Sequence, residues 1–287
     1  MEPDLDETRG RITRDGIRIH EPADFAGMRA AGRVAAELLD EVAALVEPGI
    51  GTGALDAFIR RRIEERGVGS ATIGYQPAGR EAYRHATCIS VNQVVCHGIP
   101  GEKIPGRSSD TLQNGDILNI DVTVVVDGWY GDSSRMYVAG TPKPFAARLI
   151  QVTHDALMRG IEAVRPGNTF GDIGHAIQTH VERNRMSVVR DFCGHGLGRV
   201  FHAPPNVLHY GRPGLGPVLE EGMFFTIEPM VNLGRPETRE LSDGWTAVTR
   251  DRSLSAQFEH SVGVTATGVE VFTRSPAGLF HPTRPAR

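Results

Sequence analysis

The stretch Leu112-Gln-Asn-Gly-Asp-Ile-Leu-Asn-Ile-Asp121 has a counterpart later in the chain, Leu219-Glu-Glu-Gly-Met-Phe-Phe-Thr-Ile-Glu228. In each copy a polar, glycine-containing turn leads into an apolar run that ends in a carboxylate. A carboxylate inside an apolar strand costs free energy unless another group pairs with it. Two equivalent positions that carry this cost indicate two halves of one fold that face a shared cation site.

Two further pairs of segments repeat in the same order. Pro48-Gly-Ile-Gly-Thr52 returns as Pro166-Gly-Asn-Thr169 at an offset of 118 residues, and Asp127-Gly-Trp129 returns as Asp243-Gly-Trp245 at an offset of 116. Three matches in one order predict an internal duplication whose equivalent elements are joined by loops of different length. Chance similarity is the simpler alternative, because Pro-Gly and Asp-Gly turns are common.

Each predicted half begins with two helices and continues with strands. Apolar residues at helical spacing predict helices over 21–48 and 147–164, each followed by a second helix that ends near residue 66 or 185. Runs of β-branched and aromatic residues predict strands over 117–138, 223–233 and 257–272. Strands separated by helix pairs indicate an α+β fold.

The length allows one large domain or two modest ones, and the composition is that of a folded protein with a substantial core. The chain has 287 residues, 40% of them hydrophobic, and a net charge of −4. We expect a single domain over 19–275, with halves at roughly 25–140 and 145–272, and loosely ordered ends over 1–18 and 276–287.

The same totals argue against several classes of partner. The 31 basic residues are scattered, which does not favour a nucleic-acid-binding face. No stretch predicts a secretory signal or a membrane span. Three cysteines without a C-x-x-C pair predict neither a disulfide framework nor a thiolate zinc site, and free thiols favour a cytoplasmic location.

The segment 122–130 predicts a β-hairpin, because its Asp-Gly pair favours a two-residue type I′ turn. Paired residue numbers then sum to 255, which places Asp121 opposite Ser134 and Asp132 opposite Thr123. Asp121 and Asp132 would share one face, with Cα atoms about 7–8 Å apart. Both carboxylates could then hold one cation, although a longer turn would shift this register.

A similar count around Asp243-Gly244 gives a sum of 487 and places Glu228 opposite Glu259, although Pro229 argues against an unbroken ladder. Four clustered carboxylates would repel one another, and divalent cations would neutralise them. Each acid alone has an ordinary alternative as a cap or a surface ion pair. The set is more specific than its members.

His195 is a fifth candidate ligand, in the predicted glycine-rich turn Cys193-Gly-His-Gly-Leu-Gly198, where glycines would let the backbone approach a ligand closely. The same glycines could form a phosphate loop, but no lysine follows them. Alone, His195 could be a core histidine. An oxygen-rich set with one imidazole favours manganese, iron, cobalt or zinc.

Several motifs occur in one order over approximately residues 19–272: Val95-Cys-His97-Gly-Ile-Pro100, Asn119-Ile-Asp121-Val-Thr, Gly131-Asp132, Gly194-His195-Gly-Leu-Gly, Phe225-Thr-Ile-Glu228-Pro-Met, Asp243-Gly-Trp245-Thr and Gln257-Phe-Glu259-His. Together they resemble the motifs of type I methionine aminopeptidases. The resemblance implies the pseudo-twofold α+β "pita-bread" fold, in which helices cover an antiparallel sheet.

The resemblance also implies a dinuclear site of two divalent metal ions, cobalt, manganese, iron or zinc, with these ligands: Asp121, Asp132, His195, Glu228 and Glu259. A water that bridges the metals would attack the first peptide carbonyl, and Glu228 would also move its proton. His97 and His202 would contact the scissile amide and the developing oxyanion. Without the motifs, His97 and His202 would be interpreted as ordinary histidines.

The positions that match the family's methionine pocket are Cys88, Phe201, Trp245, Tyr75 and Tyr83. Polarizable sulfur and aromatic edges suit a thioether side chain. Phe201 and Trp245 could instead be ordinary core aromatics. The chain departs from the family over 76–86, which is longer than usual and lacks a Tyr-Pro-Lys-Ser run, so the two tyrosine assignments depend on the shape of this loop.

By this resemblance the expected activity is removal of the initiator methionine from nascent polypeptides with a small second residue, by a cytoplasmic monomer. The resemblance also implies a transient contact with the ribosome. The amino-terminal extension lacks the cysteine pairs of a zinc-binding ribosome-docking module. A proline-directed metallopeptidase is the alternative enzyme, since it shares the ligand set. A non-catalytic binding protein of the same fold is the alternative of a different class.

Overall fold

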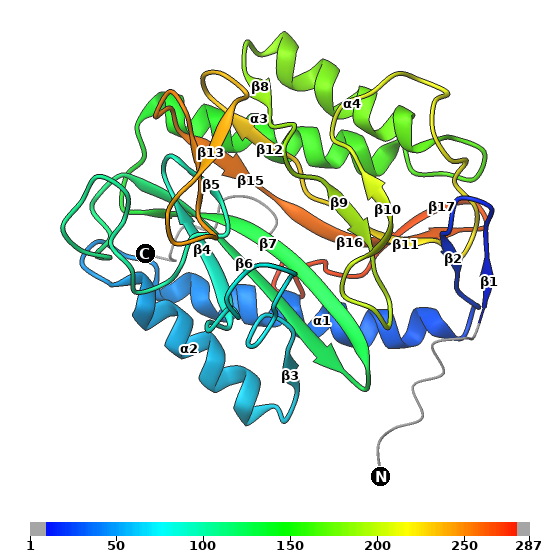
Figure 1. Ribbon diagram of the computed structural model, residues 1–287, viewed down its shortest axis with the longest axis horizontal. Coiled ribbons are helices and arrows are strands. Elements are labelled where there is room, and N and C mark those ends of the chain that lie inside the picture. Colours follow the sequence, from blue (N-terminus) through cyan, green and yellow to red (C-terminus); the bar gives the residue numbers. More distant parts are fainter. Residues whose placement is uncertain (1–9, 280–287) are drawn as a thin grey trace.

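The computed structural model describes residues 10–279 of the chain. In Figure 1, helices α1 and α2 lie below the central strands and helices α3 and α4 lie above them. The helices are α1 (Asp24–Val42), α2 (Thr52–Glu65), α3 (Pro144–Glu162) and α4 (Phe170–Arg183), with a short 3₁₀ helix, η1 (Ala43–Leu45), after α1. The predicted order of two helices followed by strands thus occurs in both halves. The first predicted helix ends earlier than expected, because a 3₁₀ turn and an extended segment precede Pro48.

The central sheet has nine strands, in the order β10-β9-β11-β16-β7-β6-β3, with β17 beside β16 and β4 beside β6. Its strands are β3 (Gly69–Ser70), β4 (Thr87–Val91), β6 (Asp116–Val126), β7 (Trp129–Ala139), β9 (Gly194–Gly196), β10 (Ala203–Val207), β11 (Phe224–Ile227), β16 (Glu259–Thr265) and β17 (Gly268–Val271). All of its pairings are antiparallel. The halves of the chain meet where β7 pairs with β16.

Two three-stranded sheets and one two-stranded ribbon complete the fold. One sheet contains β8 (Ser187–Val188), β12 (Met230–Asn232) and β15 (Ser255–Gln257); the other contains β5 (Val94–Cys96), β13 (Thr238–Glu240) and β14 (Ala247–Thr249); the ribbon contains β1 (Arg11–Ile12) and β2 (Arg18–Ile19).

The hydrophobic core divides in the same way as the chain. The amphipathic face of α1 buries Leu38, Leu39 and Val42 in a cluster with residues of α2, β4, β6 and β7. A second cluster forms around Phe225 and Ile227, between α3, α4 and the strands of the second half, and it also includes Ile117 of β6 and Val138 of β7. Burial of these apolar faces is the main favourable term that fixes each helix pair on the sheet.

The structure describes part of each chain end that the sequence predicted to be loosely ordered. Residues 10–18 belong to the β1–β2 ribbon, where Arg11 donates to Glu220 Oε2 at 2.5 Å. At the other end the backbone N–H of Ala277 donates to Asp40 Oδ2 at 3.2 Å. Residues 1–9 and 280–287 lie outside the described part of the chain. Within residues 10–279, no helix is both long and apolar enough to cross a membrane.

Candidate metal centre and substrate pocket

The first half places its two acids by a regular hairpin. Strands β6 and β7 pair over their full length, with Asp121 opposite Ser134 and Thr123 opposite Asp132. The turn between them has positive φ at Asp127 (49°) and at the following glycine (78°), as a type I′ turn requires. The predicted register is therefore confirmed, and the two carboxylates share one face of the sheet.

The second half keeps the predicted register although its strands are interrupted. Ile227 pairs with His260 in β11–β16, and Met230 pairs with Gln257 in β12–β15, so every pair sums to 487. Pro229 separates β11 from β12, as the sequence indicated. The register carries Glu228, which follows β11, to a position opposite Glu259.

The two hairpins join through one row of residues. Ser134 of β7 faces Asp121 on one side and Glu259 on the other, and the 487 register extends this row to Glu228. Residues directly opposite one another in a sheet project to the same face. Acids from both halves of the chain therefore meet at one location.

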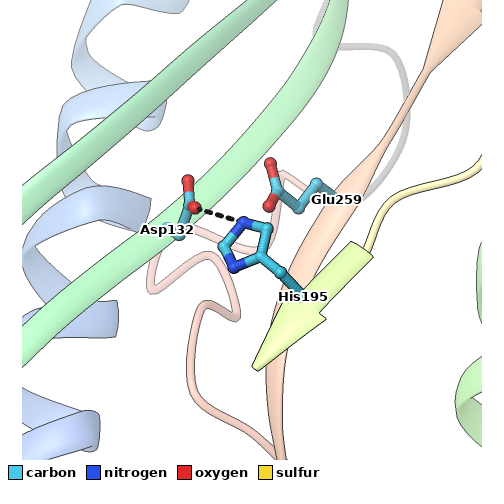
Figure 2. Close-up of side chains that lie close together, drawn as sticks. All are labelled: Asp132, His195 and Glu259. Carbon is cyan, nitrogen blue, oxygen red and sulfur yellow. Dashed lines mark ion pairs between the residues drawn. The ribbon is translucent and has the colours of Figure 1, made fainter. Parts of the chain in front are cut away.

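His195 completes the cluster from strand β9. Figure 2 shows its imidazole and the carboxylates of Asp132 and Glu259 pointing toward one another, and one ligand atom from each lies within 4.8 Å of the other two. His195 Nε2 lies 3.5 Å from Asp132 Oδ2 and 3.8 Å from Glu228 Oε1. His195 Nδ1 is 3.1 Å from the carbonyl oxygen of Gly196 and donates to it, which leaves Nε2 facing the acids.

The cluster has the electrostatics of a cation site. Burial raises the pKa of Asp121 and of Glu259 well above the ordinary range, and repulsion from neighbouring carboxylates adds to it. Burial also raises the pKa of Glu228 to about 7, against the opposing effect of His195. Burial disfavours the imidazolium form of His195, but the carboxylates of Asp132 and Glu228 outweigh it and raise the pKa. Four acids and one imidazole nitrogen therefore fit one or more divalent cations.

Hydrogen bonds from neighbouring strands orient the predicted ligands. Thr123 Oγ1 donates to Asp132 Oδ1 at 2.7 Å. Thr226 Oγ1 accepts from the backbone N–H of His195 at 3.0 Å and donates to Glu228 Oε1 at 2.8 Å. Such contacts fix ligand orientation. Both threonines stand inside the motifs that the sequence singled out, but sequence reasoning assigned them no role.

Two further contacts hold Glu228. Gln257 Nε2 lies 3.3 Å from Glu228 Oε2, and the backbone N–H of Glu228 donates to His209 Nε2 at 3.1 Å. Burial lowers the pKa of His209 to about 3, which keeps this imidazole neutral and able to accept. Gln257 had a sequence signal because it lies next to a predicted strand acid. His209 had none, since its contact depends on packing of a distant segment.

The glycines around His195 have a different role from the predicted one. Residues 194–196 form strand β9 and not a turn. A Cβ atom at Gly194 would lie 2.4 Å from the carbonyl oxygen of Thr226, and one at Gly196 would lie 2.1 Å from that of Pro204. These glycines let β9 pass between β11 and β10, so the expected close approach is to neighbouring strands and not to a ligand.

One cavity of about 930 Å³ brings all twelve predicted site residues together: Tyr75, Tyr83, Cys88, His97, Asp121, Asp132, His195, Phe201, His202, Glu228, Trp245 and Glu259. The acids and His195 form one wall of this cavity. Sequence reasoning missed several other lining residues, among them Pro77, Arg80, Phe192 and Met230. The unusual segment 76–86 was the available signal for the first two.

Aromatic rings form the apolar part of the cavity. Tyr83 lies 5.0 Å from Trp245 and Tyr75 lies 5.2 Å from Phe201, measured between ring centroids. Cys88 pairs with Asp121 across β4 and β6, which places its thiol beside the carboxylate cluster. The longer 76–86 segment therefore leaves both tyrosines on the cavity wall.

Two histidines also line this cavity. His97 has φ of 56°, a conformation that costs free energy in most residues and is enriched at functional sites. Burial lowers the pKa of His97 to about 4, and the positive charge of Arg80 contributes. The His202 ring lies 4.3 Å from that of His195, and burial lowers its pKa as well. Both rings are thus neutral at pH 7.

The fold and the acid cluster together are those of a metal-dependent hydrolase. Residues 26–266 match the sequence profile of Metallopeptidase family M24, and the chain belongs to this family. Members are metallopeptidases, so the protein depends on a divalent metal cofactor.

Named relatives narrow this class. The methionine aminopeptidase of Rickettsia prowazekii is 52% identical over 267 residues, which are 93% of this chain and 98% of the relative. Its crystal structure covers 90% of this chain and 100% of that chain with a TM-score of 0.84. Methionine aminopeptidase A of Synechocystis is 48% identical over 90% of this chain and 98% of the relative.

The prolidase of Pyrococcus horikoshii has the same fold. It is 18% identical, with a TM-score of 0.66 over 90% of this chain and 63% of that chain. The likeness at this identity concerns the fold alone. The architecture is the pita-bread α+β fold with helices over an antiparallel sheet, as expected.

Proposed function

We propose that the protein removes the N-terminal initiator methionine from nascent polypeptides whose second residue is small. One observation carries this proposal. A single cavity is lined both by the cluster of carboxylates with His195 and by aromatic side chains with the thiol of Cys88. The sequence identity of 52% to the methionine aminopeptidase of Rickettsia prowazekii supports it.

In this proposal two divalent ions, cobalt, manganese, iron or zinc, are held by Asp121, Asp132, His195, Glu228 and Glu259. Such ions polarise the scissile carbonyl and activate water. The chain's own contribution begins with Glu228, whose two oxygens are oriented by Thr226 and Gln257. A pKa near 7 suits a carboxylate that accepts and returns a proton at neutral pH.

The neutral imidazoles of His97 and His202 are proposed to donate hydrogen bonds to the scissile amide and to the oxygen that gains negative charge. Donors held in a cavity of low polarity stabilise such charge strongly, because water does not screen them. The backbone conformation of His97 fixes the direction of its side chain. Both histidines would thus orient the substrate, while the four acids and His195 bind the metal ions.

The pocket for the first side chain is proposed to consist of Cys88, Phe201, Trp245, Tyr75 and Tyr83. Aromatic edges and a thiol are favourable partners for a thioether. The space beside the acids is proposed to exclude a bulky second residue. We also propose that the protein is a cytoplasmic monomer, which acts on the nascent chain during a transient contact with the ribosome.

Hydrolysis assays on the purified protein test this proposal. The metal-free protein would be reconstituted separately with each of the four metals and assayed with Met-Ala-Ser, with Met-Leu-Ser as the control for the second residue. We expect activity on Met-Ala-Ser alone. Absence of activity with every divalent ion would contradict the enzymatic proposal, and preference for Ala-Pro peptides would replace methionine with a proline-directed specificity.

A further inference from the structure

The segment 76–82 is a closed loop between the two pocket tyrosines. The backbone N–H of Tyr83 donates to the carbonyl of Tyr75 at 2.9 Å, and that of Gly74 donates to the carbonyl of Tyr83 at 2.7 Å. These bonds join the two ends of the loop. The seven residues between the tyrosines therefore project as one unit from the wall of the cavity.

The loop has a defined shape that directs one arginine back to the cavity. The backbone N–H of Arg80 donates to the carbonyl of Pro77 at 3.1 Å, and Gly79 has φ of 80°, as in a tight turn with glycine at its third position. Gln76 Nε2 donates to the carbonyl of Arg80 at 3.0 Å. Pro77 and Arg80 both line the cavity.

Arg80 connects this loop to the β13–β14 hairpin by three contacts. Its guanidinium donates to Glu240 Oε2 at 2.5 Å and to the carbonyl oxygen of Gly244. The Cζ atom also lies 5.4 Å from the ring centroid of Trp245. One planar side chain thus contacts an acid, a backbone carbonyl and an aromatic face of the same hairpin, a combination that suits the flat, multi-donor guanidinium.

The contacts of Arg80 favour a role in orienting its neighbours over direct binding of a charged substrate group, because Glu240 already compensates the charge of the guanidinium. An isolated exposed ion pair would add little stability, but this pair also holds Trp245 in place. The Trp245 ring has Arg80 as one neighbour and Tyr83, 5.0 Å away at an angle of 66°, as another.

We propose that Arg80 is a specificity-determining positioning residue, which fastens loop 76–82 to the β13–β14 hairpin and thereby fixes Trp245 as the wall of the first-residue pocket. This inference rests on the proposed methionine pocket and names what sets its width. Loss of the contact frees Trp245 and widens the pocket. Methionine then loses complementarity, while a branched side chain such as leucine loses less.

Tryptophan fluorescence tests the contact itself without any need for activity. The chain has two tryptophans, so a Trp129→Phe background leaves Trp245 as the single indole reporter. In that background we expect Arg80→Ala and Glu240→Ala each to shift the emission to the red and to increase quenching by acrylamide. Arg84→Ala removes an exposed arginine just after this loop and should leave both signals unchanged. Identical spectra for Arg80→Ala and the background, or equal shifts for Arg84→Ala, would overturn the proposal.

Steady-state kinetics with the metal-loaded enzyme test the consequence for specificity. For Arg80→Ala we expect the KM for Met-Ala-Ser to rise about fivefold with kcat nearly unchanged, and the kcat/KM preference for Met-Ala-Ser over Leu-Ala-Ser to fall by a similar factor. Arg80→Lys, which keeps the charge but not the planar fork, should lie between Arg80→Ala and the parent. An unchanged KM and preference in Arg80→Ala would overturn the proposal. If the parent itself hydrolyses no methionyl peptide, the proposed function fails, and the fluorescence result still decides the contact.

Discussion

The two halves of the molecule bring acids to one site by strand pairing that is counted in the same way from an Asp-Gly turn. The strands are continuous in one half and interrupted in the other. In the first half, Asp121 and Asp132 lie in a single hairpin of two 11-residue strands that pair without interruption. In the second half, the hairpin is divided between two sheets. Pro229 separates β11 of the central sheet from β12 of a three-stranded sheet, and the partner strand is divided in the same way into β15 and β16, which begins at Glu259. The two halves therefore share the positions of their acids in the register, but only the first half has continuous strands.

This difference has a chemical consequence. A continuous antiparallel ladder holds Asp132 rigidly, with Thr123 directly opposite as its hydrogen-bond donor. Glu228 lies at a break in the ladder and is oriented by Thr226 of the strand that precedes it and by Gln257 of β15. We infer that the continuous half anchors the metal ions and the interrupted half supplies the acid that moves a proton.

Removal of the acid at the break should have the largest effect. Glu228→Ala is expected to lower kcat for Met-Ala-Ser by about 10³-fold or more, because both a ligand and the proton acceptor are lost. Metal affinity, measured by isothermal titration calorimetry, should also fall. Glu228→Gln keeps the size of the side chain but removes its charge, so it separates loss of the carboxylate from loss of packing. A near-normal rate in either variant would contradict the assigned role.

His97 should matter for turnover but not for metal retention. For His97→Ala we expect kcat to fall between about 10²- and 10³-fold, because a donor to the developing charge is lost. The metal content after dialysis should equal that of the parent. His97→Asn, which tolerates positive φ, separates the loss of the imidazole from backbone strain. Loss of metal in His97→Asn would make His97 a ligand.

The interrupted half should also make the metal-free protein sensitive to pH. The pKa of Glu228 is about 7 in the folded state, above the ordinary value of 4.5, so between these values the folded state keeps a proton that the unfolded chain has lost. The contribution of Glu228 to stability therefore falls as the pH rises through this window.

Urea unfolding of the metal-free protein measures this effect. Relative to the parent, Glu228→Gln should gain about 3 kcal/mol of stability between pH 4.5 and pH 8, since the amide does not titrate. Saturating metal should abolish this pH dependence, because the carboxylate is then paired. A constant difference between the two proteins across this range would show that Glu228 does not retain its proton in the folded state.

The shared register explains why much of the site could be predicted from the sequence. An Asp-Gly turn fixes which residues face one another along a hairpin, so the positions of Asp121 and Asp132 followed from simple counting. The same count placed Glu228 opposite Glu259 despite the break at Pro229. Acids in apolar strands were visible because their burial requires a partner.

The parts that could not be predicted depend on long-range packing. His209 contacts Glu228 because the fold brings the segment after β10 to the end of β11, and no local pattern distinguishes it from a core histidine. Arg80 reaches Glu240 across 160 residues of sequence. The glycines around His195 resemble a turn in sequence, and only the positions of β10 and β11 show that they belong to a strand.

The two Asp-Gly turns allow a fine comparison of the halves. Gly128 and Gly244 have φ of 78° and 75°, so an alanine at either position should cost about 1 kcal/mol of unfolding free energy through backbone strain alone. Neither glycine lines the cavity, but the carbonyl of Gly244 accepts from Arg80, which does. Only Gly244→Ala should also raise the KM for Met-Ala-Ser, by about twofold, since it disturbs a single hydrogen bond. Equal KM values in the two variants, at equal loss of stability, would mean that the second turn has no part in the pocket and that the halves differ only at their acids.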